Sequence, residues 1–158
     1  MALPTSVPEY HQSFKDMENA EVVRKRTIEL TQDDSFPLFQ VPHSGAHVPP
    51  GVAFGINGRL LTPHYRHGQI QAGTCEEWTV ISNPSQFEHS FHIHTNPYLV
   101  THEDGIAVAE PFWRDTYSHV GNNMTIKTCF NRLQPGDYVI VHCHAMAHLD
   151  IGVSTRNP

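Results

Sequence analysis

The sequence is divided into short apolar segments separated by turn-forming residues, and this pattern restricts the fold more than any other feature. Segment 26–30 (RTIEL) alternates polar and apolar residues, as a half-buried strand does. Similar short segments follow at 52–56, 76–82, 90–94, 97–101, 124–130 and 137–144. The turn signals between them include Asn57-Gly58, Asn83-Pro84, Gly121-Asn122 and Pro135-Gly136. We therefore predict an all-β fold, a Greek-key sandwich or barrel.

The length of 158 residues fits one domain. Residues 1–25 are polar and are predicted to form an N-terminal lead-in, either a short helix or an extended segment. Residues 26–158 are predicted to form the folded domain. No apolar run is long enough to cross a bilayer, and the first ten residues lack the features of a signal peptide.

The charge balance is mildly acidic, with 10 Lys and Arg against 16 Asp and Glu and a net charge of −6. Nucleic acid is therefore not expected as the main partner, because phosphate binding needs a basic face.

Histidine is the unusual residue: its 13 copies outnumber all Lys and Arg together. Since histidine is the commonest metal ligand in proteins, the positions of these residues matter most.

Six histidines and one cysteine lie in two short segments. EHSFHIH contains His89, His92 and His94, and HCHAMAH contains His142, Cys143, His144 and His148. A single histidine is more simply explained as a surface or core residue. Two such clusters in one small domain instead indicate metal binding.

Parity sorts these residues into two groups, because successive side chains on a strand point to opposite faces. His142 and His144 share one face of their segment, and Cys143 takes the other. In the first segment His92 and His94 share a face, and His89 has the opposite parity. If the two segments pair without a bulge, the predicted inward group is Cys143, His89 and His148, with His148 curling back from beyond the strand end. The predicted outward group is His92, His94, His142 and His144.

The two groups suit different metal sites. One thiolate with two imidazoles is the trigonal set of a blue-copper site, whereas structural zinc sites usually have four ligands. Val153 lies where a weak axial Met often sits, so we expect a three-coordinate copper. The outward group contains only imidazoles and suits copper or another borderline metal that handles oxygen chemistry. Because Cys143 is bonded to His142 and His144, it would provide a short electron path between the two sites.

The motifs H-x-x-H-x-H (89–94) and H-C-H-x-x-x-H (142–148) resemble the C-terminal, cupredoxin-like copper domain of multicopper oxidases, the laccase family. Segments FGINGRLL, EEWTVIS, FWRDTY and PGDYVIVHCH support the resemblance, which covers about residues 26–155. It implies that His89, Cys143 and His148 bind a type 1 copper. It also implies that His92 binds the type 2 copper, and that the type 3 pair is bound by His94, His142 and His144.

The resemblance further implies an activity and a partner. The family oxidises phenols, aromatic amines or metal ions one electron at a time, and reduces dioxygen to water at a trinuclear copper centre. Half of that centre comes from two H-x-H motifs in an N-terminal cupredoxin domain, and this sequence contains no further H-x-H. We therefore expect another domain or a partner subunit to supply the remaining ligands. Relatives are usually secreted or periplasmic. Oligomerisation stays open.

Other interpretations are a stand-alone blue-copper electron carrier and a copper-binding or storage module. The outward histidines argue against the electron carrier, because a single blue-copper site does not need these four imidazoles. A two-domain nitrite reductase fits the motifs less well. For Cys75 and Cys129 the sequence allows a disulfide or two buried thiols. Arg114 and Asp115 are expected to form a structural ion pair.

Overall fold

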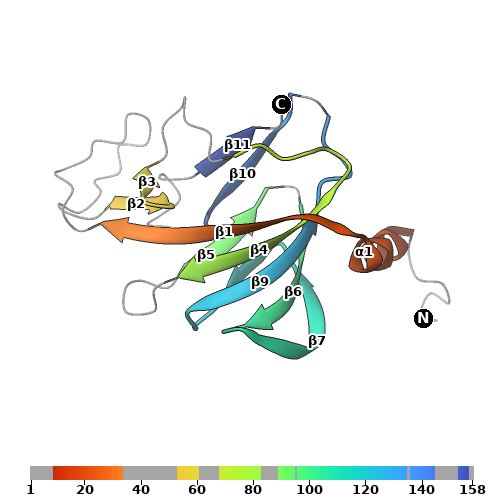
Figure 1. Cartoon of the computed structure of the whole chain (residues 1–158), viewed down its shortest axis with the longest axis horizontal. Coiled ribbons are helices and arrows are strands. Elements are labelled where there is room, and N and C mark those ends of the chain that lie inside the picture. The colour runs from red at the N-terminus through yellow and green to blue at the C-terminus, as the bar shows by residue number, and fades with distance from the viewer. Residues whose placement is uncertain are drawn as a thin grey trace, which may run out of the picture.

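The computed structural model describes residues 9–33, 53–60, 68–82, 89–94, 96–134, 136–144 and 153–156. In this part of the chain one helix precedes eleven strands (Figure 1). Their bounds are α1 Glu9–Asn19, β1 Val22–Asp33, β2 Ala53–Ile56, β3 Arg59–Leu60, β4 Cys75–Ser82, β5 Ser90–Ile93, β6 Tyr98–Glu103, β7 Ile106–Arg114, β8 Thr116–Ser118, β9 Asn123–Cys129, β10 Tyr138–Cys143 and β11 Val153–Arg156. None of the described helical residues forms a helix long and apolar enough to cross a membrane.

The strands form two sheets. Within the described residues, a seven-stranded sheet has the order β3-β2-β1-β4-β9-β6-β7, and a four-stranded sheet has the order β11-β10-β5-β8. Strands β1 and β4 are parallel, and the other described pairs are antiparallel. The prediction of an all-β sandwich is therefore confirmed.

The core consists of the alternate residues that the strands turn inward. On β4 and β9, for example, Trp78, Val80, Met124 and Ile126 are buried, while the residues between them are more exposed. In both sheets, every second side chain along a strand points to one face. These two faces enclose one apolar cluster. Its buried members are Ile28, Leu30, Ile56, Ile70, Trp78, Val80, Phe91, Ile93, Tyr98, Val100, Met124, Ile126, Phe130, Val139 and Val141.

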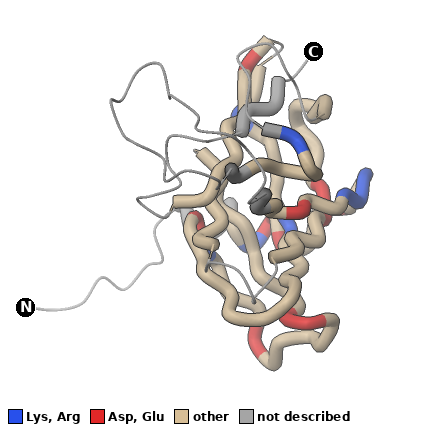
Figure 2. Tube along the Cα trace, turned by 90° about the vertical axis from the view of Figure 1, so that its left-hand side faces the viewer, with Lys and Arg blue, Asp and Glu red and all other residues tan. Residues whose placement is uncertain are grey.

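One charged side chain lies inside this apolar environment. Glu76 on β4 is 1% exposed and accepts a hydrogen bond of 2.8 Å from Nε1 of Trp78. Arg26 on β1 pairs with both carboxylate oxygens, with 2.9 Å between Nη2 and Oε1. A buried carboxylate needs such partners, because desolvation of an unpaired charge is costly. Elsewhere in the described trace, acidic positions gather at the lower end of the view in Figure 2, and the basic positions lie higher.

Cys75 and Cys129 form a disulfide, which resolves the alternative left open by the sequence. The two residues are direct partners in the register between β4 and β9, so the bond joins neighbouring strands of the large sheet. Helix α1 packs against the large sheet, where Phe14 stacks on Trp113 of β7 with ring centroids 4.8 Å apart. Lys127 of β9 donates a hydrogen bond of 2.8 Å to the carbonyl of Glu18.

The strand that sequence reasoning missed most clearly is β7. Its side chains are largely exposed and it contains Pro111, so it shows no regular inward alternation. Proline is tolerated there because β7 lies at the edge of the seven-stranded sheet as described. At the N-terminus, β1 begins at Val22 and α1 lies within the segment expected as a lead-in. The division of the chain at residue 26 stays a prediction.

Candidate metal centre

Pairing between β5 and β10 brings the two histidine motifs together. His142 is the direct partner of His92, and Cys143 is the partner of Phe91. The ladder continues past the strand ends, since the amide of His94 donates to the carbonyl of Ile140 and the amide of His144 donates to that of Ser90, at 2.8 and 2.6 Å. The four histidines of the predicted outward group are therefore held by consecutive backbone hydrogen bonds.

The rings of this group, which we call the histidine cluster (His92, His94, His142 and His144), are in mutual contact. The His92 ring centroid lies 4.9 Å from that of His94, 5.2 Å from that of His142 and 5.1 Å from that of His144. The His142 centroid lies 4.9 Å from that of His94 and 5.4 Å from that of His144. His92 and His142 are thus the central pair, and each contacts all the other members.

The cluster has the composition and spacing of a metal site. One ligand nitrogen from each of His92, His94 and His142 lies within 4.8 Å of the other two. Three converging imidazoles can bind one copper or zinc ion after small rotations of the rings. Among the described residues no other group of three histidine, cysteine or acidic side chains meets this spacing. The residues present therefore fit a metal.

Hydrogen bonds to the backbone orient the two central rings. Nδ1 of His142 lies 2.8 Å from the carbonyl oxygen of Cys143, and Nδ1 of His92 lies 2.7 Å from that of Asp115. A carbonyl oxygen can only accept, so each Nδ1 carries the proton and donates it. Nε2 then keeps the lone pair that a metal needs.

The environment of His142 and of His94 favours their neutral forms. Burial lowers the pKa of His142, and the neighbouring His94, His92 and His144 lower it further, while the hydrogen bond to the Cys143 carbonyl acts in the opposite direction. The pKa of His94 is also lowered, first by the partial desolvation of its largely exposed ring and then by His92 and His144. Nε2 of His94 lies 2.8 Å from Nε2 of His142, a hydrogen bond between two imidazoles. Neutral imidazole is the form that binds metals.

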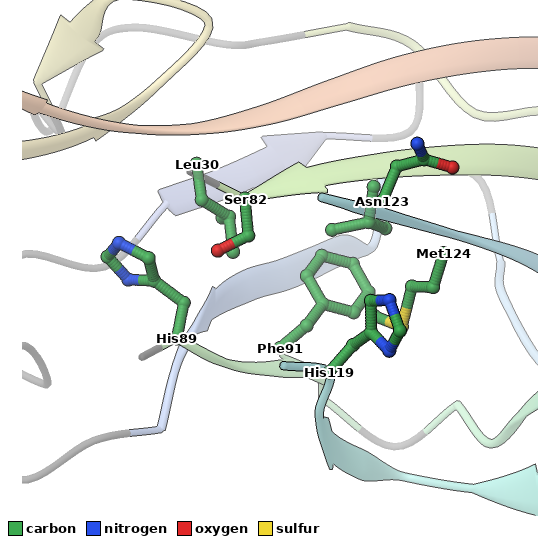
Figure 3. Close-up of a pocket in the computed structure, with 8 residues that line it drawn as sticks. Leu30, Ser82, His89, Phe91, His119, Asn123 and Met124 are labelled. Carbon is green, nitrogen blue, oxygen red and sulfur yellow. The ribbon is translucent and has the colours of Figure 1, made fainter. Parts of the chain in front are cut away.

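The predicted inward group is described only in part. Cys143 is half-buried and is not in the disulfide, and His89 is 4% exposed. His89 lines a small pocket that also contains Phe91 and Met124, and Figure 3 shows Phe91 between His89 and His119. His148 lies outside the described residues. Val153 begins β11, where its backbone is the partner of Val141, and its side chain is not described.

Sequence reasoning missed the role of segment 115–116. We expected an ion pair between Arg114 and Asp115, and the salt bridges of the described residues do not include one. The guanidinium of Arg114 instead lies 4.7 Å from the Phe112 ring centroid, and Asp115 presents its backbone carbonyl to His92. Thr116 is the direct partner of His92 in the register between β5 and β8. A backbone carbonyl that accepts a functional hydrogen bond cannot be predicted from residue type, because every residue has such a carbonyl.

Comparison with known families identifies the chain. Residues 14–157 match the family model of the multicopper oxidases. The chain belongs to the multicopper oxidase family. The resemblance inferred from the two histidine motifs is therefore confirmed, and the family is one whose members bind copper.

Solved structures of multicopper oxidases have the same cupredoxin-like fold. A laccase-like multicopper oxidase from the lignin-degrading bacterium Ochrobactrum sp. matches 99% of this chain at 17% identity, with a TM-score of 0.63. A multicopper oxidase from Campylobacter jejuni, described as a metallo-oxidase, matches 87% at 20% identity and a TM-score of 0.65. The blue copper oxidase from Nitrosomonas europaea matches 98% at 17% identity and a TM-score of 0.60. This chain covers 33%, 30% and 46% of their lengths, respectively.

Proposed function

We propose that this chain is the copper domain of a multicopper oxidase that takes single electrons from a reducing substrate. In this proposal His89, Cys143 and His148 hold a type 1 copper. The histidine cluster is one half of a trinuclear centre, in which His92 serves the type 2 copper and His94, His142 and His144 serve the type 3 pair. Bound copper would supply one-electron transfer and the reduction of dioxygen to water.

The observation that carries the proposal is the three-nitrogen group of His92, His94 and His142. These nitrogens come from two strands and converge within 4.8 Å, and hydrogen bonds orient two of the rings. The group contains no thiolate, and His94 is exposed. A simple electron carrier has one copper, bound by a thiolate and two imidazoles. It does not need a second group of imidazoles.

Cys143 supports the electron-transfer part of the proposal. It is bonded to His142 and His144, and its partner in the ladder is the buried Phe91. Parity places the Cys143 side chain on the opposite face of β10 from that of His142. One strand would therefore carry a ligand of each site, joined by covalent bonds.

We propose that the remaining ligands come from an N-terminal cupredoxin domain or a partner subunit. The chain spans about a third to just under half of the three enzymes compared above. Tyr138 and Ile140 are 47% and 39% exposed, and they share the parity of His142 on β10. An exposed apolar pair beside a half-complete metal site is a suitable docking surface for the partner.

The substrate in this proposal is a small phenolic compound or a metal ion, because the similar structures include both a laccase-like enzyme and a metallo-oxidase. We propose a secreted or periplasmic location. The disulfide between Cys75 and Cys129 supports it, since disulfides persist in oxidising compartments.

The test measures copper content and the absorption spectrum of the purified chain after loading with Cu²⁺. We expect a strong visible band from thiolate-to-copper charge transfer, which Cys143→Ser abolishes. The variant should still capture copper at the histidine cluster. Oxygen consumption is expected only with the partner domain present. A colourless chain that prefers zinc, or an unchanged band in Cys143→Ser, would falsify the proposal.

A further inference from the structure

Nδ1 of His92 faces two oxygen atoms that both come from the start of β8. The carbonyl oxygen of Asp115 lies 2.7 Å away, and Oγ1 of Thr116 lies 2.9 Å away. Both distances are within the range of ordinary hydrogen bonds. Among contacts between described residues, His92 is therefore the member of the histidine cluster whose Nδ1 contacts a side-chain hydroxyl as well as a carbonyl.

The carbonyl decides the direction of both bonds. A carbonyl oxygen cannot donate, so the short contact to Asp115 requires that His92 carries its proton on Nδ1. The Thr116 hydroxyl must then accept a share of the same proton. If Nδ1 lacked the proton, its lone pair would face that of the carbonyl at 2.7 Å, which is repulsive. Both acceptors therefore stabilise the same tautomer, with the lone pair on Nε2.

The orientation of this ring affects the whole cluster. Rotation by 180° about the Cβ–Cγ bond would exchange Nδ1 with a carbon and remove both hydrogen bonds. Because the His92 ring contacts those of His94, His142 and His144, such a rotation would also disturb the central packing. Partners of this kind commonly fix the tautomer and the orientation of ligating histidines.

Thr116 is placed by strand pairing rather than by chance proximity. It begins β8 and is the register partner of His92 on β5. Two residues further along the same ladder, Ser118 is the partner of Ser90, and their hydroxyl oxygens lie 2.5 Å apart. Both contacts use a hydroxyl of β8, and both lie on the same face of the sheet. They differ in the partner, which is His92 for Thr116 and Ser90 for Ser118.

We propose that Thr116 is a positioning residue for His92: its hydroxyl, together with the Asp115 carbonyl, holds the ring so that Nε2 is the metal-binding nitrogen. This inference rests on the metal-binding role of His92 in the proposed function. It adds a residue that is not itself a ligand.

The experiment compares wild type, Thr116→Val, Thr116→Ser and Ser118→Ala in the full chain. Long-range ¹H–¹⁵N NMR of the metal-free proteins reports the His92 tautomer, and titration with Cu²⁺ reports affinity. We expect wild-type His92 to be protonated on Nδ1. In Thr116→Val the Nδ1 proton loses one of its two acceptors and keeps the Asp115 carbonyl. The Nδ1 tautomer should therefore be less strongly favoured, so the other tautomer should gain population and the affinity for Cu²⁺ should fall about tenfold. Thr116→Ser should restore both properties, because it keeps the hydroxyl.

Ser118→Ala is the matched control, since it removes a hydroxyl contact from the same strand pair. It should lower stability about as much as Thr116→Val does, but leave the tautomer and the affinity unchanged. The inference is overturned if wild-type His92 is protonated on Nε2, if Thr116→Val binds Cu²⁺ as wild type does, or if Ser118→Ala weakens binding equally. Failure of the proposed function is distinguishable, because the wild-type chain would then bind no Cu²⁺ at the cluster while the tautomer could still be measured.

Discussion

His92 on β5 and His142 on β10 are direct partners in an antiparallel ladder, and their ring centroids lie 5.2 Å apart. Each ring donates from Nδ1 to a backbone carbonyl, that of Asp115 for His92 and that of Cys143 for His142. A shift of one residue in this register would move one histidine to the opposite face of the sheet and separate the pair. The register between two short strands therefore decides whether a metal site forms.

Replacement of an exposed ligand should weaken metal binding without affecting the fold. His94→Ala removes one of the three converging nitrogens, and the side chain is exposed, so stability should change little. We expect the affinity of the histidine cluster for Cu²⁺ to fall by at least about tenfold, measured by titration calorimetry. His102→Ala is the control, because His102 lies outside the cluster and contacts the hydroxyl of Thr101. Equal losses in both variants would contradict the assignment.

The stability of the metal-free protein should decrease as the pH falls below about 6.5, the ordinary pKa of histidine. The pKa values of His94 and His142 are lowered in the folded state by burial and by neighbouring histidines. The unfolded chain then binds protons at a higher pH than the folded one, so acid favours unfolding. The stabilisation from these two histidines is complete above their pKa in the unfolded chain. It is lost as the pH falls through their lowered pKa values in the folded protein.

Urea unfolding at about pH 7.5 and about pH 5.5 measures this effect on either side of the ordinary histidine pKa. In His142→Gln, which removes one of the two histidines with a lowered pKa, the difference between the two conditions should shrink. A difference as large as that of wild type would show that other groups are responsible.

The buried ion pair should matter far more than its exposed neighbour. Arg26→Met leaves the carboxylate of Glu76 without its cationic partner, so we expect the free energy of unfolding to fall by about 3–5 kcal/mol. Lys25→Met breaks the adjacent pair with Glu77, in which the lysine side chain is 75% exposed. Its effect should stay below about 1 kcal/mol. Chemical denaturation compares the two variants, and similar losses would contradict the importance of burial.

Loss of the disulfide should destabilise the chain without affecting the thiolate–copper site of the proposed function. Cys75 and Cys129 are 54 positions apart, so their bond restricts a long loop of the unfolded chain. We expect the double variant Cys75→Ala with Cys129→Ala to lose about 2–4 kcal/mol of unfolding free energy. The visible thiolate–copper band expected from the proposed function should persist, because Cys143 is unchanged. Loss of that band in a folded double variant would argue for a different thiolate ligand.

Several features follow from local sequence patterns alone. The two-residue period of strands is a local property, so it predicted that His142 and Cys143 would take opposite faces of one strand. The strands that carry this alternation, such as β4 and β9, were recognised for the same reason. Strand β7 was not, because it is an edge strand whose side chains are mostly exposed.

What the sequence by itself determined is the β class, the family and the shared face of His92, His94, His142 and His144, because these depend on residue type and short spacing. Only the tertiary structure decided which distant residues meet. The register of β4 with β9 made Cys75 and Cys129 a disulfide rather than two thiols. The register of β5 with β8 placed the Asp115 carbonyl and the Thr116 hydroxyl on His92. Such contacts depend on strand pairing across the chain, and no local pattern encodes the partner.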